Sequence, residues 1–137
     1  MISALVDTNV FIDVLGPASP ARTWSVVQLA RLADRGRVLI NQIIYSELAA
    51  RVPLPAVHEA LETASVNRDH LSYDAAWRAG EAHALYRRAG GLRERTLPDF
   101  LIGAQALLGG HALLTRDPER YRTYFPELNI IAPDTHP

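Results

Sequence analysis

The chain of 137 residues contains no cysteine, no lysine and no apolar run long enough to span a bilayer. The absence of cysteine excludes disulfides, thiolate zinc sites and cysteine nucleophiles. Met1 leads directly into an apolar segment without the basic region of a signal peptide, so we expect a soluble, cytoplasmic protein that does not contact a membrane. With 48% hydrophobic and 21% charged residues the composition is that of a globular protein, and we expect a single domain over residues 1–137.

Arginine supplies all 14 basic side chains, and its distribution is uneven although the net charge is only −1. Between residues 78 and 95, five arginines against two glutamates give a local charge of +3, and three more arginines lie between residues 116 and 122. An arginine-rich genome and a solvated helix face would explain this pattern. A phosphate-binding surface explains it equally well, because guanidinium groups bind phosphate oxygens in pairs. The candidates for RNA contact are Arg87, Arg88, Arg93, Arg95 and Arg116.

Short apolar runs alternate with amphipathic segments along the chain. Strands that alternate with helices predict an α/β fold with a small, mostly parallel sheet flanked by helices. The expected strands cover residues 2–6, 37–41, 111–115 and 128–132. The expected helices cover residues 8–15, 21–35, 43–50, 54–65, 73–89, 98–110 and 116–125.

Apolar spacing also predicts which helix faces are buried. Trp24 and Trp77 lie on amphipathic helices, so we expect them to anchor the core rather than to stack on bases. The five histidines show no zinc-binding spacing, and we expect them to pack in the core or on the surface. In the helix over residues 21–35, the predicted buried stripe consists of Val26, Val27, Ala30 and Ala33.

Four carboxylates stand beside the ends of expected strands. Asp7 follows the first strand, Glu47 lies on the helix after the second, and Asp117 follows the third. Asp99 opens the apolar helix that precedes the third strand. Ligands of open parallel sheets bind at the carboxyl ends of the strands, so these acids are candidates for one site. Each aspartate taken alone would be explained as a helix cap, and Asp117 is expected to open its helix with Pro118 in the first turn.

The four acids cannot share a site without a compensating charge. At separations of about 6 Å, each pair would repel by about 3 kcal/mol at an effective dielectric constant near 20. Either the acids lie apart, or a cation lies among them. Oxygen ligands suit a hard ion, Mg²⁺ or Mn²⁺. Asp13 is also acidic, but its place on the first helix predicts that it points away from the strand ends.

Four blocks of the sequence, in order, resemble the PIN-domain ribonucleases and, within them, the VapC toxins of bacterial toxin–antitoxin pairs. The blocks are "ALVDTNVFIDVL", "INQIIYSELAA", "LPDFLIGAQAL" and "ALLTRDPERYRTYFPELNIIAP". The resemblance implies a PIN-like fold and hydrolysis of RNA phosphodiesters by a water that Mg²⁺ or Mn²⁺ activates. It implies that Thr115 orients a carboxylate or water and that Asn9 helps to hold Asp7. The metal-binding and catalytic residues that it implies are Asp7, Glu47, Asp99 and Asp117.

The same resemblance implies partners. VapC-like toxins are neutralised by a small VapB-like antitoxin, whose C-terminal segment lies in a groove beside the acids. The helical hairpin over residues 43–65 would form one wall of that groove. Homodimers are usual in the family, and the apolar faces of the helices after Tyr73 are plausible contact surfaces.

Two other functions compete with this interpretation. An aspartate-nucleophile phosphatase also begins with a strand that ends in aspartate, but it needs a lysine that this chain lacks, and Asn9 stands where its second aspartate would be. A non-catalytic module would keep the acids only to bind a basic peptide or an RNA-associated partner. Metal-dependent RNA cleavage would distinguish the nuclease from both.

Overall fold

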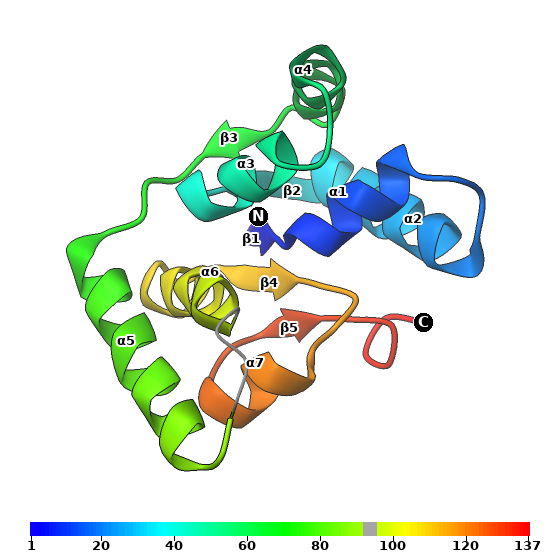
Figure 1. Ribbon diagram of the computed structural model, residues 1–137. Helices are drawn as coiled ribbons and strands as arrows, with labels where there is room; N and C mark the ends of the chain where they lie inside the picture. Colours follow the sequence, from blue (N-terminus) through cyan, green and yellow to red (C-terminus); the bar gives the residue numbers. More distant parts are fainter. Residues whose placement is uncertain (92–95) are drawn as a thin grey trace.

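The computed structural model describes residues 1–91 and 96–137 of the chain. Within these residues five strands form one sheet of order β3-β2-β1-β4-β5, in which every neighbouring pair is parallel (Figure 1). This arrangement confirms the predicted α/β class with a parallel sheet flanked by helices. The strands are β1 (Ile2–Val6), β2 (Gly36–Ile40), β3 (Asn67–Arg68), β4 (Ala112–Leu114) and β5 (Ile130–Ile131).

Helices cover both faces of the sheet (Figure 1). On one face α1 packs on α2, and α2 contacts β1 and β2. On the other face α6 contacts β1 and β4, and α5 packs on α6. No helix in the described ranges is both long and apolar enough to cross a membrane. The helices are α1 (Thr8–Leu15), α2 (Pro20–Arg35), α3 (Gln42–Ala49), α4 (Leu54–Thr63), α5 (Tyr73–Arg88), α6 (Thr96–Leu108) and α7 (Glu119–Tyr124).

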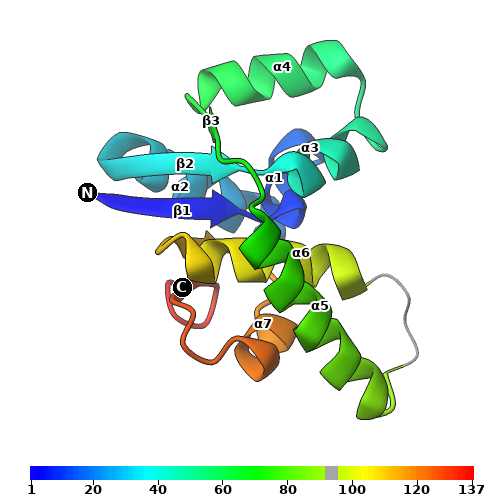
Figure 2. The same cartoon turned by 90° about the vertical axis from the view of Figure 1, so that its left-hand side faces the viewer.

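The carboxyl end of the central strand β1 lies at the edge of the sheet where the candidate site is found. Its last three residues are fully buried, because helices cover both faces, and a strand of this kind has a continuous apolar run. Leu5 pairs in register with Leu39 of β2 and with Leu113 of β4. The residues that follow these three strands therefore meet at one edge. Figure 2 shows β1 and β2 side by side, with their carboxyl ends directed towards α1 and α3.

Three local predictions were wrong. Strand β3 was not expected, because its two residues are exposed and polar and pair with β2 only through the backbone. Trp77 is 76% exposed rather than buried, whereas Trp24 packs against the core. Helix α7 begins at Glu119 with Pro118 as its N-cap residue, so Asp117 lies before the helix and does not cap it.

The buried face of α2 also differs from the prediction. The four residues of the predicted stripe, from Val26 to Ala33, are exposed. The face of α2 that packs towards the sheet is instead the neighbouring one. Two polar side chains of that face are satisfied by hydrogen bonds, since Ser25 donates to Asp13 and Gln28 donates to the carbonyl oxygen of His136. Apolar spacing alone could not show that polar residues would be buried here. The residues that are buried are Ser25, Gln28, Leu29 and Leu32.

Candidate metal centre

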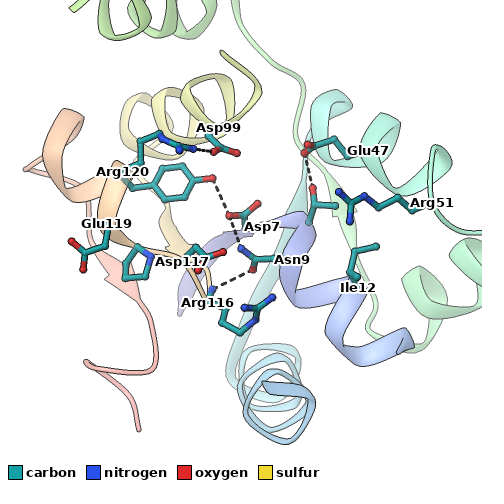
Figure 3. A pocket seen from close by; sticks show the side chains of 13 residues that line it. Asp7, Asn9, Ile12, Glu47, Arg51, Asp99, Arg116, Asp117, Glu119 and Arg120 are labelled. Atoms are coloured by element: carbon teal, nitrogen blue, oxygen red, sulfur yellow. Dashed lines mark hydrogen bonds and ion pairs between the residues drawn. The ribbon is translucent and has the colours of Figure 1, made fainter. Parts of the chain in front are cut away.

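The four predicted acids line one cavity of about 530 Å³ at the carboxyl edge of the sheet (Figure 3). Asp7 links β1 to α1, Glu47 lies on α3, and Asp99 lies in the first turn of α6. Asp117 lies between β4 and α7. The fold therefore brings together four carboxylates from four separate segments. We call this space the acidic cavity; its other lining residues include Thr8, Asn9, Arg51, Arg116, Arg120 and Tyr121.

Asp7 is the most deeply held of the four acids. Asp7 occupies the N-cap position of α1, as its explanation as a helix cap requires, but its side chain makes no cap hydrogen bond with this helix. Its Oδ2 atom instead accepts hydrogen bonds from Thr115 Oγ1 at 2.9 Å and from Tyr121 OH at 2.9 Å. Asn9 Nδ2 donates a third bond to the same oxygen at 3.2 Å. These donors come from three segments, namely α1, α7 and the residue that follows β4, and they fix the carboxylate at the strand end.

Thr115 and Asn9 lie where the resemblance placed them, beside Asp7. Thr115 Oγ1 also accepts a hydrogen bond from the backbone N–H of Asp117 at 3.1 Å, so one hydroxyl joins the first and last acids. The side-chain oxygen of Asn9 accepts from the backbone N–H of Arg116 at 3.2 Å. These bonds hold the segment after β4 against the start of α1.

The electrostatic state of Asp7 follows from its burial. Burial above all, together with the negative charges of Asp99 and Glu47, raises the pKa of Asp7 from 3.8 to about 7. The hydrogen bonds from Thr115 and Tyr121 oppose this rise. Near neutral pH the protonated and the charged forms of Asp7 therefore coexist. A cation bound beside it would favour the charged form.

Each of the other two partly buried acids has its own partner (Figure 3). The guanidinium of Arg120 forms a hydrogen-bonded ion pair with Asp99. Burial raises the pKa of Asp99, and the charge of Arg120 opposes that rise. Glu47 accepts a hydrogen bond from Thr8 Oγ1 at 2.7 Å. Both carboxylates are thus held in defined positions at the cavity wall.

The chemistry of the side chains fits a hard divalent cation, because the candidate ligands are carboxylate oxygens with hydroxyl and amide groups behind them. Asp7, Asp99, Glu47 and Asp117 would hold it. Among residues 1–91 and 96–137, no three acidic or histidine side chains lie close enough together to bind one metal ion as they stand. Asp99 is instead paired with the guanidinium of Arg120.

The predicted arginines lie in different settings. Arg116 lines the cavity, but its Nε atom pairs with Asp13 Oδ2 at 2.7 Å. Asp13 does not line the cavity, and its carboxylate accepts hydrogen bonds from Arg116 and Ser25. Arg87 and Arg88 lie exposed in the last turn of α5, away from the cavity wall. The other two candidates, Arg93 and Arg95, lie outside the described residues.

Tyr121 and Arg51 are among the cavity residues that sequence reasoning missed. The sequence does carry a signal for Tyr121, because Tyr121 and Phe125 are apolar aromatic residues four positions apart, a spacing that predicts one buried face of a helix. The structure buries both side chains. Arg51 follows Glu47 by four residues, a spacing that places side chains on one side of a helical segment. Each described histidine has a hydrogen-bond partner and none lines the acidic cavity, as expected.

A parallel α/β sheet with an acidic cavity at its carboxyl edge defines the structural class of this protein. The chain belongs to the PIN-domain family, because the sequence model of the PIN domain matches residues 4–126. This match confirms the family to which the four sequence blocks pointed. No curated protein matches the chain.

Solved structures of toxin–antitoxin complexes are similar to this chain. VapBC-1 from nontypeable Haemophilus influenzae has a TM-score of 0.69 at 18% identity, over 96% of this chain and 98% of that chain. VapBC2 from Rickettsia felis, bound to a promoter DNA fragment, has a TM-score of 0.68 at 17% identity, with the same coverage of 96% and 98%. A toxin–antitoxin complex from Klebsiella pneumoniae has a TM-score of 0.60 at 26% identity, over 93% of this chain and 95% of that chain.

Proposed function

We propose that this chain is the toxin of a type II toxin–antitoxin pair and that it acts as a Mg²⁺- or Mn²⁺-dependent endoribonuclease. The observation that carries the proposal is the single cavity, in a PIN fold, lined by four carboxylates from four segments. Similarity to three toxin–antitoxin complexes supports the biological role. The chain would act as a single PIN domain in the cytoplasm.

The side chains have distinct parts in this activity. Asp7, Glu47, Asp99 and Asp117 would hold the cation. When bound, a divalent cation lowers the pKa of an attacking water and offsets the charge that develops on the phosphate. Thr115, together with Asn9 and Tyr121, keeps the carboxylate of Asp7 in one orientation, since all three donate to its Oδ2 atom.

Cleavage of RNA tests the proposal. The purified chain, free of any partner, should cleave a mixed RNA pool in the presence of Mn²⁺, and EDTA should stop the reaction. Asp99→Asn should abolish cleavage, because it removes a charged oxygen from the cavity while keeping the size of the side chain. Asp74→Asn is the matched control, since Asp74 is exposed in the first turn of α5 and does not line the cavity. Binding of RNA without cleavage would instead support the non-catalytic module.

An apolar groove offers a place for the antitoxin. A second cavity of about 420 Å³ lies between α1, α2 and α4, and α4 is the second helix of the predicted hairpin. Helix α1 connects this groove to the acidic cavity, because Ile12 lines the acidic cavity and Val14 lines the groove. We propose that a segment of a VapB-like antitoxin packs in this groove. The exposed stripe of α2 contributes Val26, Ala30 and Ala33 to its lining.

Helix α5 offers a surface for a homodimer. Tyr73 is 95% exposed, Trp77 is 76% exposed and Leu85 is 51% exposed on this helix. Large apolar side chains gathered on one exposed helix are typical of protein contact surfaces. We propose that two copies of the chain meet through α5.

A further inference from the structure

Arg120 occupies the carboxylate of Asp99, and we propose that it is a built-in competitor of the metal ion at this ligand. The proposal rests on the proposed metal-dependent function and adds a residue that sets the affinity for the metal. Under this proposal a cation must compete with the guanidinium of Arg120 for the carboxylate of Asp99. In the absence of metal, the guanidinium of Arg120 therefore supplies the positive charge beside Asp99.

The position of Arg120 is defined by contacts on two elements. Its Nη1 atom donates to Asp99 Oδ2, from α7 to α6 (Figure 3). Its guanidinium carbon lies 5.8 Å from the centre of the Tyr86 ring on α5, within the range of a cation–π contact. Arg120 therefore rests against defined partners when no metal is bound.

Arg120 differs from the other arginines of the acidic cavity. Arg116 is held by Asp13, which lies outside the cavity lining. Arg51 has no acidic partner within salt-bridge distance in the described part of the chain. Among the described arginines that line the cavity, Arg120 alone pairs with a candidate metal ligand.

The strength of the pair suits a competitor that can be displaced. The side chains of Arg120 and Asp99 are 30% and 31% exposed, so water screens their attraction. Partly exposed ion pairs of this kind are weak, and a divalent cation attracts a carboxylate more strongly than a guanidinium does. The cation should therefore displace Arg120, at a cost in affinity. Removal of Arg120 should recover that cost and also remove a repelling charge from the cavity.

A purely structural role makes a different prediction. If Arg120 only ties α7 to α6, its removal lowers the melting temperature and leaves the affinity for metal unchanged or weaker. If Arg120 competes with the metal, its removal tightens metal binding whatever happens to stability. Affinity for Mn²⁺ alone, measured without RNA, separates the two roles.

The test is a Mn²⁺ titration of the full-length chain at pH 8, with free Mn²⁺ followed by electron paramagnetic resonance. Arg120→Ala and Arg120→Gln should each bind Mn²⁺ roughly three- to tenfold more tightly than the wild type. The second variant keeps most of the side chain and guards against misfolding, which thermal unfolding monitors. Arg122→Ala is the control, because Arg122 also lies on α7 and pairs with an acid, Asp134, but does not line the cavity. Its affinity should equal that of the wild type.

The outcomes separate this proposal from the proposed function. If Asp99→Asn weakens Mn²⁺ binding but neither Arg120 variant tightens it, the metal site stands and the competitor role is overturned. If the wild type and every variant fail to bind Mn²⁺, the metal-dependent function fails and the competitor role fails with it. Equal tightening by Arg122→Ala would also overturn the proposal, because a general charge effect would then explain the result.

Discussion

Tyr121 donates its phenolic hydrogen to Asp7 Oδ2 at 2.9 Å, although the two residues lie 114 positions apart in the sequence. Burial raises the pKa of Tyr121 well above its ordinary value, and the charge of Asp7 raises it further. The hydroxyl therefore keeps its proton throughout the neutral range and remains a donor. This contact fixes α7 to the end of β1 and supports the charged form of Asp7.

Tyr121→Phe should lower the free energy of unfolding by about 1–3 kcal/mol at pH 8, because a buried carboxylate loses a hydrogen-bond donor. The loss should be smaller at pH 5, where Asp7 is largely protonated. Urea denaturation at both pH values measures this. Tyr124→Phe is the control, since the Tyr124 hydroxyl makes no hydrogen bond within the described residues. An equal loss at both pH values would show that the contribution of the Tyr121 hydroxyl does not depend on the charge of Asp7.

Asp7→Asn should stabilise the protein at pH 8 when EDTA removes divalent cations. The pKa of Asp7 is about 7 in the folded state against 3.8 for the unfolded chain, so folding favours the proton. This contribution to stability is complete below pH 3.8 and is lost as the pH rises through about 7. Asparagine keeps an acceptor for the three donors and carries no charge to desolvate.

The difference between Asp7→Asn and the wild type should therefore grow from pH 4.5 to pH 8. Urea denaturation across this range measures it, and Mn²⁺ should stabilise the wild type more than the variant. A variant that is less stable than the wild type at pH 8 in EDTA would contradict the prediction. It would mean that the hydrogen bonds of the charged carboxylate outweigh its desolvation.

Arg51→Ala should weaken RNA binding, because Arg51 lines the cavity without an acidic partner in the described ranges. Loss of one phosphate contact should reduce the slope of log affinity against log salt by about 0.7. Fluorescence anisotropy with labelled RNA, in an Asp99→Asn background that prevents cleavage, measures the slope. Arg31→Ala, an exposed substitution on α2, should leave both the affinity and the slope unchanged.

Trp77→Arg should disrupt the proposed homodimer. A charge at the centre of the exposed face of α5 would have to be buried in the contact, so dimerisation should weaken by about tenfold or more. Size-exclusion chromatography with light scattering measures the mass. Val27→Arg is the control, because Val27 is 40% exposed on α2 and should lie outside the contact. A dimer that survives Trp77→Arg would exclude this face of α5.

Ala60→Arg should prevent neutralisation by the antitoxin while leaving RNA cleavage intact. Ala60 lines the apolar groove on α4, and a long charged side chain there would fill it. A cognate VapB-like antitoxin should then inhibit cleavage about tenfold less effectively, or worse. Ala89→Arg places the same side chain at an exposed position after α5 and should leave inhibition unchanged. Loss of inhibition in both variants would exclude a specific role for the groove.

Strands and the acids beside them could be predicted because their signals are local. The apolar run before Asp7 forms β1, and the apolar segment after Asp99 forms most of α6 and contributes six of the buried residues of that helix. Contacts between distant segments left no local signal. Trp77 is exposed although its helix is amphipathic, and β3 forms through backbone bonds to β2 without an apolar run.

By itself, the sequence determined the order of the described helices and of four of the five strands, the family, and the four acids that line the cavity, because periodicity and residue type are properties of neighbouring positions. Only the tertiary structure decided what each acid faces. Asp7 accepts hydrogen bonds from Thr115 and Tyr121, 108 and 114 positions away, as well as from Asn9, and Asp99 pairs with Arg120. The physical reason is that burial and charge pairing depend on which segments the parallel sheet brings to one edge. A local sequence pattern does not contain that information.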